Sequence, residues 1–314
     1  MRRRAFFGAV AMGLAGTAAP RWLTGSVGHA GDEAFVERWS WAMGQPVRLR
    51  LFAESESAGY DAAQAALAEL RRVEGALSRF DESSDLSELN RRAGRGPIAG
   101  GPDLLAVLAS AVEFRRSTEG AFDAAIEPLM RTWGFHAPRA GEPTPAELAE
   151  ARAAVHAAGI DLGEGRVALR GAATRLDLGG IGVGYGLDRA AEVLRRSGVR
   201  RALLDVSGDC VALGAPPGES GWLVEIADPE RPGTVMGSTR LRDAALATSS
   251  NLVSVVRYGR AVRGHVMDPA SGYPAAQCRQ VSVVARTGLE ADALSTAMLV
   301  SPRKYPGVLR SYVR

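Results

Sequence analysis

Apolar side chains in the first half of the chain follow one strand-like pattern and three helical ones. Residues 47–52 alternate apolar and charged side chains, as in a strand with one buried face. Residues 58–80 and 102–117 repeat apolar side chains at helical spacing and predict two helices, the second with a proline in its first turn. Residues 144–158 begin with Thr-Pro-Ala-Glu, a capping box, and predict a third helix.

The second half of the chain has the pattern of short strands separated by glycine and proline turns. Helical spacing interrupts this pattern at residues 185–197 and 290–300. Strands are predicted by the apolar runs at residues 202–206, 223–226 and 281–285. The whole pattern predicts an α+β fold, a single domain of mixed sheet and helices with a helical insertion near residues 100–160.

The first thirty residues hold the positive excess of the chain. They contain four arginines and no acidic residue, so the formal net charge falls from +3 to −1 without them (38 basic residues less four, against 35 acidic ones). Arginines at positions 2–4 precede an apolar run to Ala19, which is typical of a twin-arginine export signal. We expect this signal over residues 1–30, a short linker over 31–42 and the functional domain over 43–314. Whether the signal is cleaved or kept as a membrane anchor stays open.

A glycine-rich segment at residues 176–188 (LDLGGIGVGYGLD) leads from a strand into a helix. Glycines allow close backbone approach, and amides at a helix start can bind an anion such as a diphosphate. The glycine spacing is not that of a dinucleotide-binding Rossmann turn. A purely structural glycine turn is the alternative.

Two further segments place polar groups close together. Residues 265–274 (HVMDPASGYP) set His265 and Asp268 in a loop rich in turn-forming residues. Asp292 and Thr296 are four residues apart and so lie on one face of a predicted helix. Two hard oxygen donors suit Mg²⁺, which binds few protein oxygens besides substrate phosphates. An acidic residue near a helix start can also serve only the helix dipole.

Three shorter segments complete the set. Residues 118–123 (TEGAFD), with a nearby Trp-Gly-Phe, supply aromatic rings that could flank a flat ligand. Residues 206–209 (VSGD) and 247–250 (ATSS) follow or end predicted strands, where binding loops are common.

Together, and in this order, the segments resemble the FAD:protein FMN transferases, the ApbE-like family. That family shows Met-Gly, T-x-G-x-F-D with W-G-F, L-D-L-G-G-I-x-K-G, G-G-E, A-T-S-G, H-x-x-D-P-x-T-G-x-P and A-D-A-L-x-T-A. The matching segments here begin at Met43 and run to residue 297, so the resemblance covers residues 43–300.

The resemblance implies a T-fold-related α+β domain that uses Mg²⁺ and transfers FMN from FAD to a Ser or Thr hydroxyl, releasing AMP. It implies that His265 assists the acceptor hydroxyl and that Asp268, the second predicted catalytic residue, orders the His265 loop. The implied metal-binding residues are Gly180, Asp292 and Thr296. The implied flavin-binding residues are Met43, Phe122, Asp123, Gly180, Val183, Asp188, Asp209, Thr248, Ser249 and His265.

The implied partners are FAD and an acceptor flavoprotein, which the family resemblance suggests is a membrane-anchored redox subunit, in the periplasm or another extracytoplasmic space. Because the basic excess lies in the predicted signal, we expect no nucleic-acid partner. The oligomeric state is left open.

The chain departs from the family pattern at several positions. Val183 stands where the family has Lys, while Ser207 and Asp209 replace Gly and Glu. Two other functions therefore stay open: an FAD-binding carrier or assembly factor without transfer, and an FAD pyrophosphatase with water as the acceptor.

Overall fold

The structure is a computed structural model that describes residues 33–314. The predicted export signal lies outside the described residues. Within residues 33–314, no helix is both long and apolar enough to cross a membrane. The predicted linker over 31–42 is wrong for most of its length, because Ala34–Ala42 forms the first strand of the main sheet.

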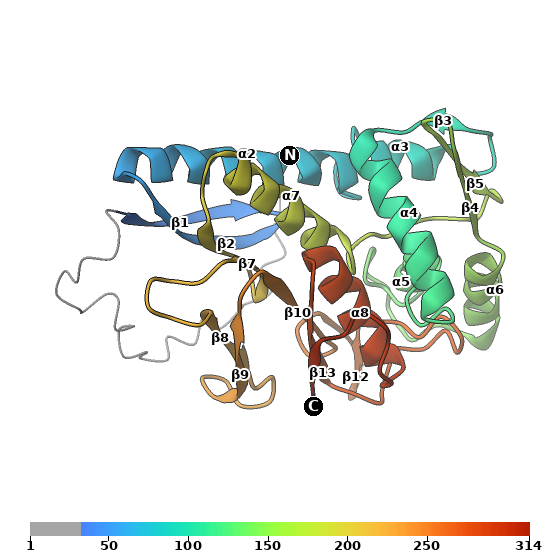
Figure 1. The fold of residues 1–314 in the computed structure, drawn as a ribbon. Coiled ribbons are helices and arrows are strands. Elements are labelled where there is room, and N and C mark those ends of the chain that lie inside the picture. The colour runs from blue at the N-terminus through green and yellow to red at the C-terminus, as the bar shows by residue number, and fades with distance from the viewer. Residues whose placement is uncertain (1–32) are drawn as a thin grey trace, which may run out of the picture.

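One antiparallel sheet of seven strands organises the fold (Figure 1). Its strand order is β1-β2-β6-β7-β10-β13-β14. The strands are β1 (Ala34–Ala42), β2 (Gln45–Ala53), β6 (Arg201–Val206), β7 (Asp209–Leu213), β10 (Ala244–Ser250), β13 (Gln280–Ala285) and β14 (Arg310–Val313). The strands predicted at 47–52, 202–206 and 281–285 are confirmed as parts of β2, β6 and β13.

A tight turn joins β1 and β2. Met43 and Gly44 both have positive φ angles, 57° and 69°, as a two-residue hairpin turn requires. The Gly44 N–H donates to Glu74 Oε1 at 3.0 Å, which ties the turn to the neighbouring helix. The positive φ angles of this turn therefore explain the Met-Gly pair in the sequence. The turn also places Met43 at the end of the sheet.

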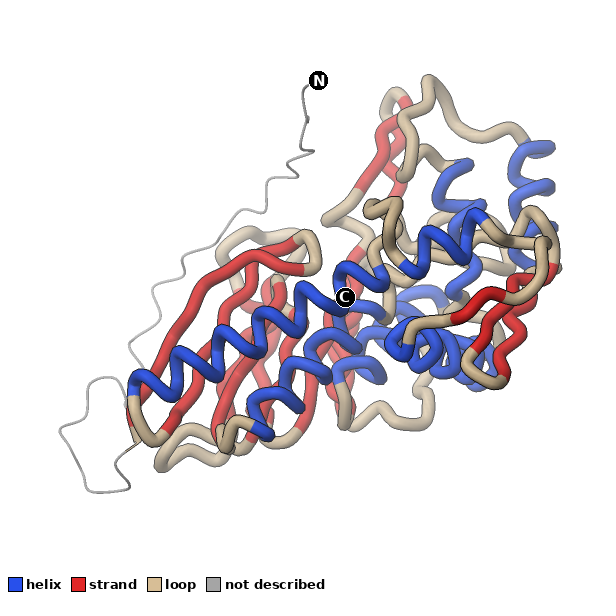
Figure 2. The backbone as a smooth tube through the Cα atoms, turned by 90° about the horizontal axis from the view of Figure 1, so that it is seen from above, coloured by secondary structure: helices blue, strands red, loops and turns tan. Residues whose placement is uncertain are grey.

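Three helices cover one face of this sheet (Figure 2). They are α2 (Glu56–Leu77), α7 (Gly182–Arg196) and α8 (Gly288–Val300). The three helices predicted here are confirmed with shifted starts, and α7 begins three residues before its predicted start. A Cβ on Gly184 would lie 2.1 Å from the Gly288 carbonyl oxygen. Some of the glycines that we assigned to a binding loop therefore let α7 and α8 pack backbone to backbone.

The opposite face carries a separate hairpin of β8 (Trp222–Ala227) and β9 (Val235–Leu241). Trp222 is fully buried there with Phe52 and Leu203 in a second hydrophobic cluster. The strand predicted at 223–226 is confirmed, but it pairs with β9 and not with the main sheet.

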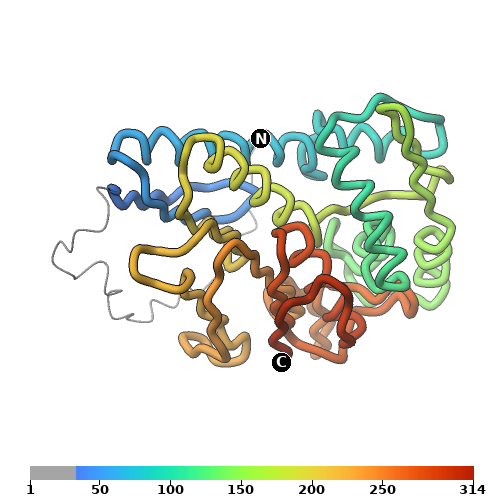
Figure 3. Tube along the Cα trace, in the orientation of Figure 1, coloured from blue at the N-terminus to red at the C-terminus, as the bar shows by residue number. Residues whose placement is uncertain are grey.

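The predicted insertion lies beside these layers (Figure 3). It contains α3 (Asp85–Arg91), α4 (Pro102–Ser117), the short η1 (Ala124–Ile126), α5 (Glu127–Thr132) and α6 (Pro145–His156). The capping box of α6 is confirmed, with Thr144 and Glu147 bonded in both directions. A small sheet of β3 (Ile98–Ala99), β4 (Gly159–Gly163) and β5 (Arg166–Arg170), which the sequence did not predict, completes this part.

The insertion is joined to the sheet in two ways. Its helix α4 shares the main hydrophobic core through Leu104, Val107 and Leu108. The segment after the hairpin of β11 (Val255–Tyr258) and β12 (Ala261–Gly264) returns to the insertion, where Trp133 Nε1 donates to the Gly272 carbonyl at 2.8 Å. The loop that contains His265 is thereby held between the two parts.

Candidate active site

A cavity of about 860 Å³ lies where the sheet ends, the glycine-rich segment and the insertion meet. This volume is in the range of cofactor-sized sites. Eleven of the thirteen predicted site residues line it: Met43, Phe122, Asp123, Gly180, Val183, Asp209, Thr248, Ser249, His265, Asp292 and Thr296. The fold thus brings together residues from both halves of the chain.

Asp188 is one of the two that do not line the cavity. Its Oδ1 and Oδ2 accept hydrogen bonds from the Gly288 and Leu289 amides at 2.7 and 2.9 Å. The carboxylate therefore caps the first turn of α8, and burial raises the pKa of Asp188 to about 6. A direct flavin contact is not what this geometry offers; Asp188 instead positions the helix that carries Asp292 and Thr296.

Asp268 is the other. It orders its own loop, as predicted, since Oδ1 accepts from the Ala270 amide at 2.9 Å and its carbonyl accepts from the Gly272 amide at 2.8 Å. Its side chain is not part of the cavity wall. This geometry fits the loop-ordering role of Asp268, and its catalytic role stays a prediction.

The three predicted metal-binding residues come together at the wall of the cavity. A Cβ on Gly180 would lie 2.9 Å from Thr296 Oγ1, so the glycine backbone passes directly over that hydroxyl. Thr296 Oγ1 is 3.1 Å from Ser249 Oγ. Asp292 Oδ2 accepts a hydrogen bond from the Gly184 amide at 3.0 Å.

The buried Asp292 and the half-buried Asp209 lie close to one another in this wall. Burial, with the like charge of Asp209, raises the pKa of Asp292 well above its usual range. Burial likewise raises the pKa of Asp209, which accepts from the Thr248 amide at 2.8 Å. Paired carboxyls of this kind fit a cation, which removes both the desolvation cost and the repulsion. No group of three or more Asp, Glu, His or Cys that could hold a metal occurs within residues 33–314. Hydroxyl, carbonyl and ligand oxygens would therefore have to complete the coordination, as Mg²⁺ allows.

The cavity wall as a whole is acidic. Among the residues that the structure describes, six carboxylate side chains line it, against one arginine, two histidines and no lysine. The carboxylates are Glu74, Asp123, Asp177, Asp209, Glu225 and Asp292. An anionic ligand would be repelled by this wall unless a cation entered with it.

His265 reaches the cavity from the loop after β12. Its Nδ1 is buried and finds no hydrogen-bond partner among residues 33–314. Burial lowers the pKa of His265, against a hydrogen bond to the Ser254 backbone that raises it. The ring is therefore neutral at pH 7 and keeps one nitrogen without a hydrogen bond, as a general base requires.

A model of the ApbE family matches residues 43–311, most of the chain. The chain belongs to the ApbE family. An FAD:protein FMN transferase of Treponema pallidum is 31% identical over 314 residues, covering 90% of this chain and 86% of the relative. One of Haemophilus influenzae is 29% identical and covers 74% of this chain and 70% of its own length. The predicted family and enzyme class are confirmed.

Solved structures agree with this ApbE-family assignment. The ApbE protein of Thermotoga maritima superimposes with a TM-score of 0.78 at 27% identity, covering 85% of this chain and 87% of that one. The flavinyl transferase ApbE of Pseudomonas stutzeri gives a TM-score of 0.74 at 25% identity, with 85% of each chain covered. The α+β fold predicted from the sequence is confirmed.

The ApbE-family cavity also contains a charged group that we did not predict. His136 lies between two carboxylates, with Nε2 3.1 Å from Asp177 Oδ2 and Nδ1 3.2 Å from Glu127 Oε1. Arg79 Nε is 3.3 Å from Asp177 Oδ2. Asp177 stood inside a segment that we singled out, and His136 directly follows the Trp-Gly-Phe motif. Their contact depends on the tertiary fold, so motif order alone does not reveal it.

Phe80 was also missed as a site residue. The sequence placed it at the end of a helix, but α2 ends at Leu77, and Phe80 lines the cavity with 83% of its surface exposed. The Arg79 guanidinium carbon lies 4.0 Å from the Phe80 ring centre. The Phe80 ring thus presents an exposed face at the cavity, although aromatic rings are normally stabilised by burial.

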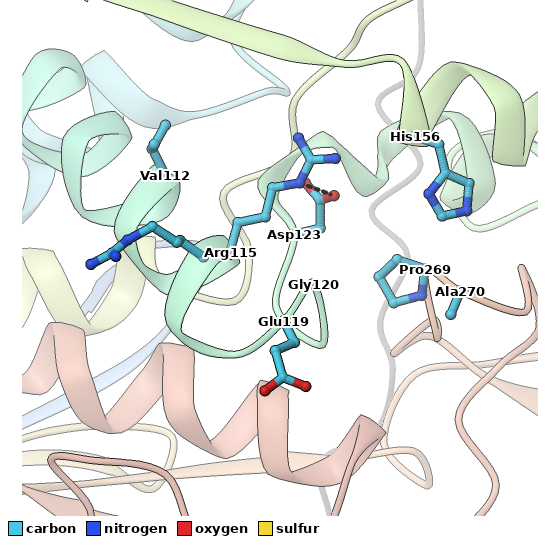
Figure 4. A pocket seen from close by; sticks show the side chains of 9 residues that line it. Val112, Arg115, Glu119, Gly120, Asp123, His156, Pro269 and Ala270 are labelled. Atoms are coloured by element: carbon cyan, nitrogen blue, oxygen red, sulfur yellow. Dashed lines mark ion pairs between the residues drawn. The ribbon is translucent and has the colours of Figure 1, made fainter.

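A smaller pocket of about 470 Å³ adjoins the cavity behind Asp123 and Pro269, which line both (Figure 4). Arg115 Nε pairs with Asp123 Oδ2 at 3.0 Å, and Asp123 Oδ1 accepts from the Ala125 amide at 2.9 Å. Both oxygens of Asp123 are therefore engaged within the protein. The predicted role of Asp123 in shaping the flavin site fits this geometry better than a direct contact does.

Proposed function

We propose that this chain transfers FMN from FAD to the hydroxyl of a Ser or Thr in an acceptor protein. The acceptor oxygen forms a bond to the FMN phosphorus, the phosphoanhydride bond breaks, and AMP leaves with the bridging oxygen. The observation that carries the proposal is the carboxyl pair of Asp209 and the buried Asp292, beside Gly180 and Thr296 in an acidic cavity of cofactor size. Such a wall suits a diphosphate only when a divalent cation accompanies it.

Asp292, Thr296 and the Gly180 carbonyl are the residues that would hold Mg²⁺. The ion would neutralise charge on the diphosphate oxygens during transfer. The capping of α8 by Asp188 fixes where these ligands lie. Thr248 and Ser249, at the end of β10, border the same region.

His265 is our candidate for the proton transfer. The acceptor hydroxyl loses its proton as its oxygen attacks phosphorus, and Nδ1 of the neutral ring can accept it. The Asp268 loop holds His265 against the cavity without taking part in the chemistry. Positioning and charge neutralisation supply most of the rate in reactions of this class.

Val183 favours one alternative. It lines the cavity where the family pattern has a lysine, and among residues 33–314 Arg79 is the single arginine or lysine in the wall. A wall with this little positive charge could bind FAD with its metal and yet transfer slowly, as in a carrier or assembly factor.

The deciding experiment supplies the purified chain with FAD, Mg²⁺ and an acceptor domain that an active relative is known to modify. AMP release together with an FMN-sized mass increase on a Ser or Thr would support the transferase. Bound FAD with neither product would favour the carrier. AMP and free FMN without a modified acceptor would favour the pyrophosphatase.

We further propose that the protein acts outside the cytoplasm on an exported or membrane-anchored redox protein. The support is the arginine-rich and apolar pattern of residues 1–30. Replacing Arg2, Arg3 and Arg4 by lysine should retain the protein in the cytoplasm, as cell fractionation would measure. Unchanged export would leave this pattern without a role in targeting.

A further inference from the structure

The imidazole of His136 faces a carboxylate at each nitrogen, Glu127 at Nδ1 and Asp177 at Nε2. A neutral imidazole has one N–H and can donate to only one of them, whereas the imidazolium donates to both. The side chain is 7% exposed, so water does not readily replace the missing donor. The hydrogen-bond geometry therefore selects the charged ring.

Charged groups from every neighbouring element are balanced around this ring. Arg79, just after α2, pairs with Asp177, and Arg131 on α5 pairs with Glu127 at 2.6 Å. His265 faces Asp177 from the loop after β12 and is neutral. Burial by itself lowers the pKa of His136, but the hydrogen bonds to Asp177 and Glu127 outweigh it, and the pKa is raised.

Asp177 connects this ring to the rest of the cavity. Its Oδ1 accepts from the Gly179 amide at 2.7 Å, and its own amide donates to the Ala124 carbonyl at 2.8 Å. The next residue, Gly180, is the one whose backbone passes over Thr296 Oγ1. Contacts thus run without a break from His136 to the residues that would hold the metal.

We infer that His136 is a positioning residue for flavin binding and transfer. As an imidazolium that joins Glu127 to Asp177, it fixes the glycine-rich segment against the metal-binding residues. The expected effect of His136 on transfer rests on the proposed function. Its expected effect on FAD binding does not.

The two histidines of the cavity then act in opposite charge states. His265 must be neutral, so transfer falls at acidic pH as it gains a proton. His136 must be protonated, so transfer and FAD binding fall as the pH rises through its raised pKa. Loss of that proton leaves one carboxylate without a donor and releases the glycine-rich segment.

The first experiment uses His136→Gln, whose amide can donate to one carboxylate only. We expect Mg²⁺-dependent FAD affinity and kcat to fall about 10- to 100-fold, as for groups that orient metal ligands. We also expect the alkaline loss of FAD binding to disappear. His156→Gln, a matched change on α6 outside the cavity wall, should behave as wild type. An unchanged affinity and pH profile in a folded His136→Gln protein would overturn the inference.

The second experiment moves the pKa without removing the ring. Glu127→Gln takes away one of the two charged acceptors, so the alkaline limb of FAD binding should shift to lower pH. An alkaline limb that stays in place would show that His136 does not set it.

The third experiment measures the charge of His136 directly and does not depend on enzyme activity. The sequence has four histidines, so the imidazole NMR signal that vanishes in His136→Gln identifies His136. It should have the protonated shift at pH 7 and titrate above the ordinary value of about 6.5. A neutral ring at pH 7 would overturn the inference. A wild-type protein that binds FAD but modifies no proven acceptor would instead count against the proposed function alone.

Discussion

At the scale of single residues, the cavity contains acidic and basic groups that the protein holds away from their ordinary charged forms. Asp209 and Asp292 are carboxyls whose ionised forms are costly without a cation. His265 is a buried base kept neutral. Each of these groups is held in an unfavourable state that a ligand would relieve, a metal ion for the carboxyls and a reacting hydroxyl for the imidazole. Such residues mark function more clearly than residues whose hydrogen bonds are all satisfied.

Asp292→Asn should remove Mg²⁺-dependent turnover. The amide keeps the shape but lacks the charge that binds the ion, so we expect a loss of about 100-fold or more, equivalent to several kcal/mol. Steady-state AMP release against Mg²⁺ concentration measures it. Glu290→Gln on the same helix lies outside the cavity wall and serves as the control. Equal activity in the two variants would remove Asp292 from the metal site.

His265→Ala should slow transfer far more than it weakens FAD binding. A lost general base typically costs about 10²- to 10⁴-fold in rate. The acidic limb of the pH–rate profile should vanish as well, because the lowered pKa of His265 sets it: activity is present above that pKa and lost below it. Single-turnover kinetics and flavin fluorescence titration separate the two effects. A matching loss of affinity and rate would make His265 a binding residue.

At the scale of elements, the sequence predicted the long helices and the strands β2, β6, β8 and β13. It set no bounds for the central strands β7 and β10 and missed the edge strands β1 and β14. Residues 102–117 had clear apolar spacing and a helix-starting proline, and α4 has those bounds. Strand β1 was missed because its large aromatic side chains lie on the more exposed face, while the face with the buried Val36 carries mostly small or polar residues. Trp39 and Trp41 are exposed at the sheet edge while Val36 is buried, so no clean alternation identifies the strand.

Helix α8 depends on the cap formed by Asp188, a role that the sequence motif did not indicate. Asp188→Ala removes two hydrogen bonds to the first turn and should lower the free energy of unfolding by about 1–2 kcal/mol, with FAD binding impaired only indirectly. Asp188→Asn retains an acceptor and should lose less. Urea unfolding measures the stability and fluorescence titration the affinity. A large loss of FAD affinity in Asp188→Ala at unchanged stability would restore the direct flavin contact that we first expected.

At the scale of the whole molecule, the cavity belongs to neither layer alone. Asp209 and Thr248 come from the sheet, Asp292 from a covering helix, and His136 and Phe122 from the insertion. Motif order predicted that most of these residues share a site, since eleven of thirteen line the cavity. It could not predict the contact of His136 with Asp177, because only packing of the insertion against the glycine-rich segment brings the two side chains together.

A cavity built this way should make FAD and Mg²⁺ stabilise the fold together rather than separately. Without a metal, the carboxylates of the wall that stay ionised repel the diphosphate, and ionising Asp209 and Asp292 together is costly. FAD alone should therefore raise the melting temperature little, Mg²⁺ alone somewhat, and both together by more than the sum. At 100 times the Kd, the ternary complex would gain about 2.7 kcal/mol. Thermal unfolding with each ligand, with both, and with EDTA measures this coupling. A full effect of FAD in the presence of EDTA would mean that the acidic wall tolerates the diphosphate without a metal, and Asp209 and Asp292 would then need another explanation.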